Sequence, residues 1–275
     1  MSTSAPAAVA YLGPKATFSH IAAVRAFPLA RHVETGSIAG VVEQVASGAV
    51  DAGVVPIENS TEGGVAPTLE ALFEGSVSIR GELVVEVDLY LLARHGDRSR
   101  IRRIASHPQP LGQSRRFIAR EFPSAIAVPF SSTTAAAEEA LRDDETAAIT
   151  SPLAAELLGL TILQKSVQDR SDNATRFVII AREDAAPTGR DKTSLVFTTP
   201  HERGALRRAL EVFDDAGLNL TRIESRPAPG RLWEYVFFTD VEGHRLDPEL
   251  ARALERLLAL CSTVRVLGSY PRAAG

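Results

Sequence analysis

Cysteine is nearly absent from this chain. Cys261 is the single cysteine among 275 residues, which rules out an intramolecular disulfide and a cysteine metal cluster. The six histidines, at positions 20, 32, 95, 107, 201 and 244, show no spacing typical of metal ligands. We therefore expect no metal site, and a chain without disulfides fits the reducing cytoplasm.

Lysine and long apolar runs are also scarce. Lysine occurs only at positions 15, 165 and 192, and the net charge is −4 at pH 7, which gives no electrostatic reason to expect nucleic acid binding. The apolar runs are too short to span a bilayer, and residues 1–10 lack the basic start and apolar core of a signal peptide. These features predict a cytoplasmic protein that binds neither nucleic acid nor membrane.

The common motifs for nucleotides and nucleophiles are missing as well. The sequence contains no GxGxxG, no GxxxxGK[ST] and no GxSxG pattern. The remaining signals are polar residues at the ends of predicted strands, where α/β proteins place their ligand sites.

The first part of the chain alternates between strand-like and helix-like segments. Residues 9–12 and 51–57 have the pattern of buried strands, and residues 17–27 and 38–46 that of helices. This alternation predicts an α/β layer with a mainly parallel sheet.

Two long extended segments, residues 81–93 and 160–167, bracket a middle region that also alternates strands and helices. Ser131 or Ser132 can cap a helix through Leu141 there, and Pro152 suits the first position of the next helix. The arrangement predicts two lobes joined by two crossing strands, with a cleft between them for a small ligand.

The pattern changes after a short linker at residues 185–189. Strands at 193–199, 219–225, 233–239 and 264–267 alternate with helices that begin near Glu202 and Asp247. The order is βαββαβ, a ferredoxin-like module. The side chains expected to face inward from its helices are Leu206, Leu210, Phe213, Leu250, Leu254, Leu257 and Leu258.

Polar residues gather at the ends of four of the predicted strands, in residues 13–19, 58–64, 106–114 and 175–177. Each of the first three segments, taken alone, has the composition of an ordinary capped turn or solvated loop. Arg176 differs, because a buried guanidinium needs a partner. An anionic substrate and a structural carboxylate both satisfy that need.

Four family patterns occur together and in order. They are GPxGT(F/Y)S as GPKATFS at 13–19, ENSxxG at 58–63, SHPQxLxQC as SHPQPLGQS at 106–114, and TRF at 175–177. Ala16 replaces a usual glycine, and Ser114 replaces a common cysteine. Over residues 9–185 the chain therefore resembles the prephenate dehydratase family.

The C-terminal part resembles the ACT regulatory domain of the same family, through a GAL motif at 204–206 and an ESRP motif at 224–227. The resemblance implies a phenylalanine site between subunits, and so a homodimer or homotetramer. The residues it assigns to that site are Gly204, Ala205, Leu206, Asn219, Leu220, Glu224, Ser225 and Arg226.

The resemblance also implies the fold. We expect an α/β chain with a two-lobed, type II periplasmic-binding-protein-like catalytic domain at residues 1–188 and a ferredoxin-like βαββαβ ACT domain at 192–275. Lobe 1 would comprise about 1–82 and 164–188, and lobe 2 about 83–163.

The implied reaction is the loss of carbon dioxide and water from prephenate to give phenylpyruvate in L-phenylalanine biosynthesis. Aromatisation drives it, so no cofactor is expected. Thr175 would donate a hydrogen bond to the leaving hydroxyl. The other catalytic residues implied are Glu58, Asn59, Ser106 and Gln113, and the substrate-binding residues are Thr17, Ser60, Arg176 and Phe177.

Three alternatives remain open at this point. The substrate can be arogenate, whose side chain adds an ammonium group. The chain can be a non-catalytic amino-acid sensor, although a sensor has no need for Thr175 beside Glu58 and Asn59. A periplasmic binding protein fits less well, because it would carry a signal peptide and no ACT module.

Overall fold

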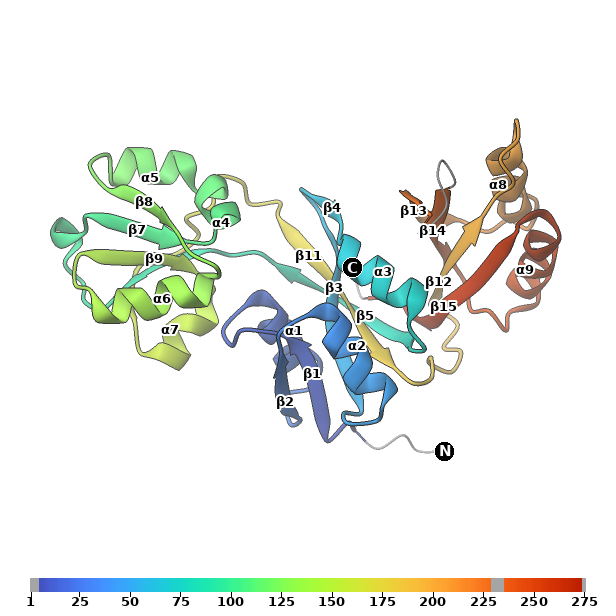
Figure 1. Cartoon of the computed structure of the whole chain (residues 1–275), viewed down its shortest axis with the longest axis horizontal. Coiled ribbons are helices and arrows are strands. Elements are labelled where there is room, and N and C mark those ends of the chain that lie inside the picture. Colours follow the sequence, from blue (N-terminus) through green and yellow to red (C-terminus); the bar gives the residue numbers. More distant parts are fainter. Residues whose placement is uncertain (1–4, 229–234, 274–275) are drawn as a thin grey trace.

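Three β-sheets divide the molecule into a first lobe, a second lobe and a C-terminal module (Figure 1). The computed structural model describes residues 5–228 and 235–273. The first lobe lies between the other two parts. None of the described helices is long and apolar enough to cross a membrane.

The first lobe is built on a sheet with the strand order β2-β1-β3-β11-β5, and β4 pairs with β3. Strand β1 runs parallel to β2 and β3, whereas β11 is antiparallel to both β3 and β5. The strands are β1 (Ala8–Leu12), β2 (Arg31–Thr35), β3 (Ala52–Asn59), β4 (Gly63–Gly64), β5 (Ser78–Glu86) and β11 (Ala174–Ala181). The helices are α1 (Phe18–Ala26), α2 (Ile38–Ala46) and α3 (Ala66–Glu74).

The second lobe has a sheet with the order β10-β6-β9-β7-β8 and helices on both faces. Its strands are β6 (Tyr90–Ala93), β7 (Arg103–Ser106), β8 (Ile126–Pro129), β9 (Thr146–Thr150) and β10 (Thr161–Gln164). Its helices are the short η1 (Arg98–Arg100), α4 (Pro108–Gln113), α5 (Arg115–Glu121), α6 (Thr133–Arg142) and α7 (Pro152–Leu158). Helices α4 and α5 follow one another directly and are separated by a break at Ser114.

The prediction of a mainly parallel sheet was wrong, since both lobes contain mixed sheets. The cause is the connection between the lobes. The chain leaves the first lobe through β5 and returns through β11, and these two strands pair antiparallel. The crossing segments are bonded to each other, with Val87 N donating to Asn173 O at 2.9 Å and Val167 N donating to Leu89 O at 2.8 Å.

The C-terminal module has the predicted βαββαβ order and the sheet order β13-β14-β12-β15. Its elements are β12 (Asp191–Thr198), α8 (Ala205–Asp215), β13 (Leu220–Pro227), β14 (Tyr235–Glu242), α9 (Pro248–Leu260) and β15 (Thr263–Pro271). Trp233, expected to begin the third strand, lies outside the described residues. Leu257 is buried, but Leu258 is 58% exposed, so the inward position predicted for it was wrong. Successive helical residues point about 100° apart, and both cannot lie at the centre of one apolar stripe.

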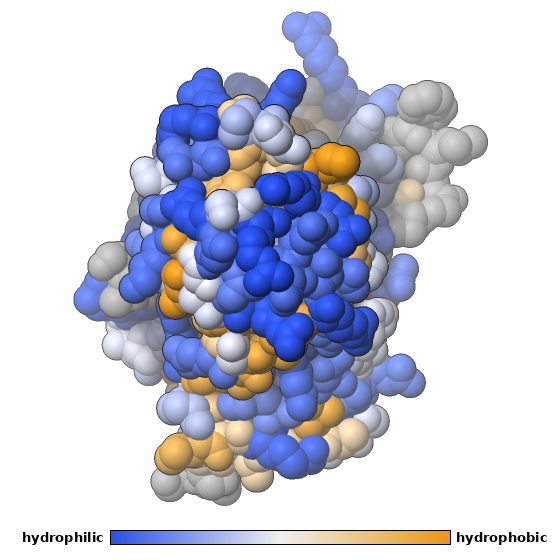
Figure 2. Space-filling model, turned by 90° about the vertical axis from the view of Figure 1, so that its left-hand side faces the viewer, coloured by the Kyte–Doolittle hydropathy of each residue, from blue (hydrophilic) through white to orange (hydrophobic). Residues whose placement is uncertain are grey.

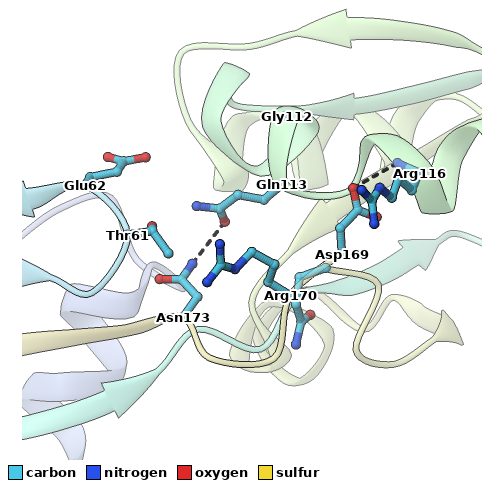
Figure 3. A pocket seen from close by; sticks show the side chains of 9 residues that line it. Thr61, Glu62, Gly112, Gln113, Arg116, Asp169, Arg170 and Asn173 are labelled. Atoms are coloured by element: carbon cyan, nitrogen blue, oxygen red, sulfur yellow. Dashed lines mark hydrogen bonds between the residues drawn. The ribbon is translucent and has the colours of Figure 1, made fainter.

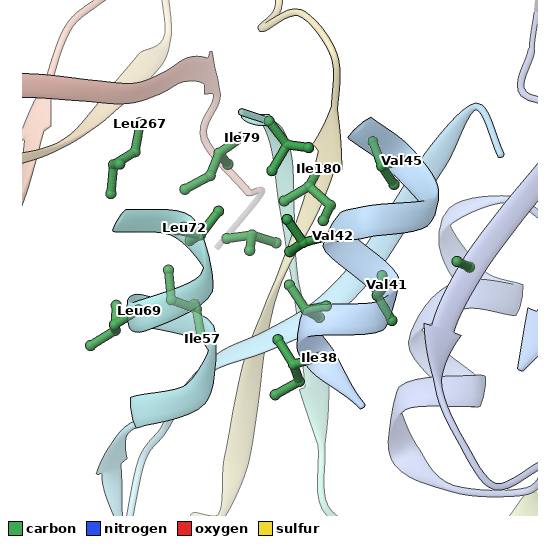
Figure 4. Close-up of a cluster of buried hydrophobic side chains, with 14 of the residues drawn as sticks. Ile38, Val41, Val42, Val45, Ile57, Leu69, Leu72, Ile79, Ile180 and Leu267 are labelled. Atoms are coloured by element: carbon green, nitrogen blue, oxygen red, sulfur yellow. The ribbon is translucent and has the colours of Figure 1, made fainter. Parts of the chain in front are cut away.

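One hydrophobic cluster is shared by the first lobe and the C-terminal module (Figure 4). Helix α2 contributes Val41 and Val45, and α3 contributes Leu69 and Leu72, while Leu267 comes from β15 of the module. Arg265 adds polar contacts, donating to the carbonyl oxygens of Phe73 and Gly75. The module is therefore packed on the first lobe as a continuation of its core.

The far end of the second lobe presents a mostly hydrophilic surface with scattered apolar residues (Figure 2). Its apolar side chains are instead turned to the two faces of its sheet, as Ile104 and Ala105 on successive positions of β7 show. Buried polar side chains such as Asn59 and Asn173 lie between the lobes.

Candidate active site

A cavity of about 360 Å³ lies between the two lobes and is lined by both. The first lobe supplies the turn after β1, the end of β3 and the start of β11. The second lobe supplies one side of α4, with the residue before it, and the residues at the start of α6. The polar lining residues are Thr17, Ser19, Asn59, His107, Gln109, Gln113, Ser131, Ser132, Thr133, Asn173 and Thr175.

Thr175 is held at this cavity by an amide. Asn59 and Thr175 are paired across β3 and β11, and Asn59 Nδ2 donates to Thr175 Oγ1 at 3.0 Å. A hydroxyl has one proton to donate and accepts with its lone pairs. Because its oxygen accepts from Asn59, the Thr175 hydroxyl keeps its proton for another acceptor. Among the described residues, none accepts it, so a ligand in the cavity can.

The hydrogen bonds of its carbonyl oxygen fix the orientation of the Asn59 side-chain amide. Asn59 Oδ1 accepts from Thr61 N at 3.0 Å, from Thr61 Oγ1 at 2.7 Å and from Glu62 N at 3.2 Å. Two of these donors are backbone amides, so the oxygen must face them and Nδ2 must face Thr175. The ENS loop thus sets the direction of the hydrogen bond at Thr175.

Asn173 joins the two lobes and was missed as a site residue. Its Oδ1 accepts from Asn59 Nδ2 at 2.8 Å, and its Nδ2 donates to Gln113 Oε1 at 3.2 Å. Asn173 is 5% exposed. The sequence did contain a signal, because Asn173 lies two residues before Thr175 and alternate residues of an extended segment share a face.

A second cavity, of about 680 Å³, adjoins the first and shares Gln113 and Asn173 with it. Figure 3 shows the Gln113–Asn173 hydrogen bond with the guanidinium of Arg170 beside it. Arg116 also lines this space. The same lining contains the acidic Glu62 and Asp169, and Arg170 pairs with Asp172 at 2.6 Å. The formal charges of this second cavity are therefore balanced.

The first cavity itself has little formal charge. Its described lining contains no lysine, arginine, aspartate or glutamate. Helices α1 and α6 both begin at it, capped by Thr17 and Ser132, and neither has an acidic residue in its first turn. Helix N-termini carry partial positive charge and attract anions. The cavity is therefore suited to a ligand that is anionic and partly apolar.

Five of the predicted site residues meet at this cavity: Thr175, Asn59, Gln113, Thr17 and Phe177. Ser106 and Ser60 do not line it. The fully buried Ser106 donates to Ile149 O, which ties β7 to β9. Ser60 Oγ donates to Asp172 O at 2.9 Å and accepts from Ala174 N at 3.0 Å, which ties the ENS loop to β11.

Glu58 and Arg176 lie on the opposite face of the sheet from the cavity, which corrects the expectation that they contact substrate. Arg176 Nη1 lies 2.6 Å from Asp240 Oδ2 of the C-terminal module and 3.3 Å from Glu58 Oε2, and its Nε lies 2.8 Å from Glu82 Oε2. Burial disfavours the charged guanidinium, but Asp240 and Glu82 outweigh it, and the pKa of Arg176 is raised above its usual value. Neighbouring residues of a strand point to opposite faces, so Thr175 and Arg176 cannot both face the cavity.

The predicted phenylalanine site is only partly assembled within one chain. Gly204, Ala205 and Leu206 line a cavity of about 240 Å³ together with Tyr235 and Phe237. The other predicted residues do not line it. They are Asn219, Leu220, Glu224, Ser225 and Arg226, all in or next to β13.

Comparison with known proteins shows which family models and relatives the sequence matches. Residues 9–185 match the family model for prephenate dehydratase, and residues 193–259 match the model for the ACT domain. A bifunctional chorismate mutase/prephenate dehydratase from Aquifex aeolicus is 43% identical over 266 residues, which cover 96% of this chain and 74% of that protein.

Two solved structures are similar along nearly the whole chain. Prephenate dehydratase from Arthrobacter aurescens, solved in complex with L-Phe, superposes with a TM-score of 0.89 at 38% identity and covers 96% of this chain and 90% of that one. A protein described as a novel type of quorum quenching acylase superposes with a TM-score of 0.88 at 34% identity, over 96% of this chain and 98% of that one.

Proposed function

Because the chain belongs to the prephenate dehydratase family, we propose that its interlobe cavity converts prephenate to phenylpyruvate. Prephenate carries two carboxylates and a ring hydroxyl. In the reaction the bond to the ring carboxylate breaks, carbon dioxide leaves, and the electron pair aromatises the ring as the hydroxyl departs. The departing hydroxide takes up a proton and becomes water.

The observation that carries this proposal is the hydrogen bond from Asn59 to Thr175. It leaves the Thr175 proton available to the leaving hydroxyl. A threonine hydroxyl is too weak an acid to give its proton away completely, so the hydrogen bond acts by strengthening as negative charge builds on the departing oxygen. Asn173 and Gln113 hold the two lobes around the reacting ring.

The substrate carboxylates need partners other than Arg176, which is occupied by acidic groups. The N-termini of α1 and α6 face the cavity, and the hydroxyls of Ser19, Ser131 and Thr133 line it beside them. Neutral donors of this kind bind a carboxylate without the strong solvation that would retard loss of carbon dioxide. Phe177 supplies an apolar wall for the ring.

The lining also favours prephenate over arogenate. Arogenate carries an ammonium group, which calls for an acidic partner when it is taken out of water. The described lining of the interlobe cavity contains no aspartate or glutamate.

The likeness to an acylase makes amide hydrolysis the second candidate. Such chemistry uses a nucleophile activated by a neighbouring base. His107 is the imidazole at the cavity, and its described hydrogen bond is with the backbone of Gln109, at 3.5 Å, and with no serine. Dehydration is therefore the better fit to this site.

The proposal extends to regulation and assembly. Residues 1–188 form the catalytic unit, in which lobe 1 comprises about 1–82 and 164–188, and residues 192–275 bind L-phenylalanine between the subunits of a homodimer or homotetramer. The enzyme works in the cytoplasm. There Cys261 remains a thiol, and burial raises its pKa to about 11, which keeps it unreactive.

The test is the rate of phenylpyruvate formation by the wild type and by Thr175→Val. Valine keeps the shape of threonine and removes the hydroxyl. Since positioned proton donors contribute about 10²–10⁴ in rate, kcat should fall in that range while KM changes little. Thr175→Ser keeps the hydroxyl and is the matched control.

Three outcomes would overturn the proposal. Thr175→Val with wild-type kcat would remove the assigned role of the hydroxyl. A wild-type enzyme that binds prephenate without turnover would instead be a sensor. Faster turnover of arogenate, or of an N-acyl amide, than of prephenate would change the substrate.

A further inference from the structure

We propose that Arg176 is a positioning residue that couples the C-terminal module to Thr175. The inference rests on the proposed function and extends it. In the β3–β11 ladder, each pair of facing residues forms one rung. The module binds one rung and thereby fixes the position of the next rung, which carries the reacting hydroxyl.

The two rungs are adjacent and face opposite ways. Thr175 pairs with Asn59, and Arg176 pairs with Glu58. The Asn59–Thr175 rung faces the interlobe cavity and is closed by a side-chain hydrogen bond of 3.0 Å. The Glu58–Arg176 rung faces the module and is closed by an ion pair of 3.3 Å. A shift of either strand at one rung must move the other, because their backbones are continuous.

The module holds Arg176 from two strands. Asp240 of β14 binds Nη1 at 2.6 Å, and the hydroxyl of Tyr270 on β15 accepts from Nη2 at 3.1 Å. Asp240 and Tyr270 are 1% and 0% exposed, and Ser194 of β12 hydrogen-bonds to both. Buried hydrogen bonds between charged groups are strong and directional. Glu82 of β5, in the first lobe, binds Nε at 2.8 Å. The guanidinium therefore bridges the module and the first lobe, and a movement of the module changes its contacts directly.

Glu58 is held by the module as well. Its Oε2 lies 3.6 Å from Nε of Arg222 on β13. Arg222 in turn hydrogen-bonds to Glu224, whose carboxylate lies so close to Gly64 that a Cβ there would be 1.9 Å from it. Strand β13 thus touches both ends of the ENS loop, which orients Asn59.

These contacts give the module a means of changing the rate. A ligand alters activity only if it binds two states of the protein with different affinity. A rotation of the module would weaken the contact of Asp240 with Arg176 and that of Arg222 with Glu58 at the same time. The hydroxyl of Thr175 would then shift. A misplacement of about 1 Å at a reacting group can cost about 10² in rate.

The experiment compares Asp240→Asn with Asp215→Asn in the full chain. Asp240→Asn keeps the shape of the side chain and removes the charge that holds Arg176. Asp215 pairs with Arg256 at 2.7 Å between the exposed faces of α8 and α9, so Asp215→Asn is a control with the same change of charge. Each variant is measured for kcat and KM with prephenate, for the L-phenylalanine concentration that gives half its effect, and for amide hydrogen exchange.

We expect Asp240→Asn to lower kcat by up to about 10²-fold with little change in KM. The half-effect concentration of phenylalanine should shift by about 2- to 30-fold, the range for mutations along a coupling path. Exchange should become faster at residues 57–60 and 174–178. Asp215→Asn should match the wild type in all three measurements.

Tyr270→Phe removes only the hydroxyl that binds Arg176, and it repeats the test if Asp240→Asn does not fold. Wild-type kcat, phenylalanine response and exchange in a folded Asp240→Asn or Tyr270→Phe would overturn the inference. An inactive wild type would overturn the proposed function alone. In that case amide hydrogen exchange, which needs no substrate, still tests whether Arg176 couples the module to Thr175.

Discussion

Ala16 shows how a single residue can depart from a family pattern and keep the turn. It has φ of 65°, a conformation that favours glycine, and is 1% exposed. The left-handed region costs an L-residue about 1–2 kcal/mol. Burial of the methyl group returns about 0.8 kcal/mol, and alanine restricts the unfolded chain by a further 0.4–1 kcal/mol or so. The terms are of similar size, so alanine is tolerated in this turn, between the lining residues Pro14 and Thr17.

A contact in the same turn predicts how the free energy of unfolding depends on pH. Ala16 N donates to His20 Nδ1 at 3.1 Å, so the imidazole must be neutral at that nitrogen. Burial lowers the pKa of His20, and His32 and Lys15 lower it further against the opposing effect of Glu34. The unfolded chain takes up a proton near the ordinary histidine pKa of about 6.5, and the folded chain does so only at lower pH. The free energy of unfolding should therefore fall as pH drops below about 6.5.

Urea unfolding at pH 7.5 and at pH 5.5 measures this change. His20→Asn keeps an acceptor near Ala16 N and cannot titrate, so its loss of stability between the two pH values should be smaller than that of the wild type. Equal losses in the two proteins would assign the pH dependence to other groups.

At the scale of elements, local signals predicted several helix starts, although helix α3 was not predicted. Thr17 caps α1 at the start of the segment expected to be helical. Ser132, one of the two serines considered, caps α6, and Pro152 begins α7 as expected. These features depend only on neighbours in sequence. Strand β2 was missed, because Arg31–Thr35 is partly exposed and lacks an alternating apolar pattern.

The sequence could not show which face of the sheet holds the site. The sequence indicated that Glu58, Asn59, Thr175 and Arg176 belong together, and they do form two adjacent rungs. Which rung faces the ligand depends on what covers the other face of the sheet. That cover is the C-terminal module, which is folded from residues far along the chain.

The junction of β15 with β5 gives a prediction at this scale. Gly268 has φ of 153°, and a Cβ there would lie 2.1 Å from the carbonyl oxygen of Ile79. Gly268→Ala should lower the free energy of unfolding by about 2 kcal/mol or more, from backbone strain and overlap combined. Gly96→Ala is the control, because nothing lies within 4 Å of the added atom. Urea unfolding measures the free energy of unfolding of both variants. Equal values for the two would contradict a close contact at Gly268.

At the scale of the whole molecule, the module acts on the cavity through the first lobe. The two share a hydrophobic cluster to which Val196, Phe238 and Leu267 of the module belong. The second lobe closes the other side of the cavity and is tied to the first through Asn173 and the crossing segments. A change in the module therefore reaches Thr175 by way of β3 and β11, without having to pass through the second lobe.

The phenylalanine site makes the last prediction, which concerns assembly. Gly204 stands at the start of α8, whereas Asn219 lies beyond its end. Helix α8 has 11 residues, and at a rise of 1.5 Å each it spans about 16 Å, more than the length of one amino acid. A single phenylalanine therefore cannot contact both Gly204 and Asn219 of one chain. The ESRP motif is nearer to Gly204, because Ser225 and Pro227 pair with Phe237 and Tyr235 of the cavity lining. We expect Asn219 to come from a partner subunit.

Phenylalanine should therefore bind the assembled protein better than the separated chain and should promote assembly. At a free concentration 100 times its Kd, linkage stabilises the bound form by about 2.7 kcal/mol for each site, or about 100-fold in the equilibrium constant. Sedimentation of a dilution series should show dissociation at lower protein concentration with L-phenylalanine than without it. L-alanine, which lacks the ring, is the control. Tight binding of phenylalanine to the dissociated chain, with no shift in the dilution curve, would show that one chain forms the whole site.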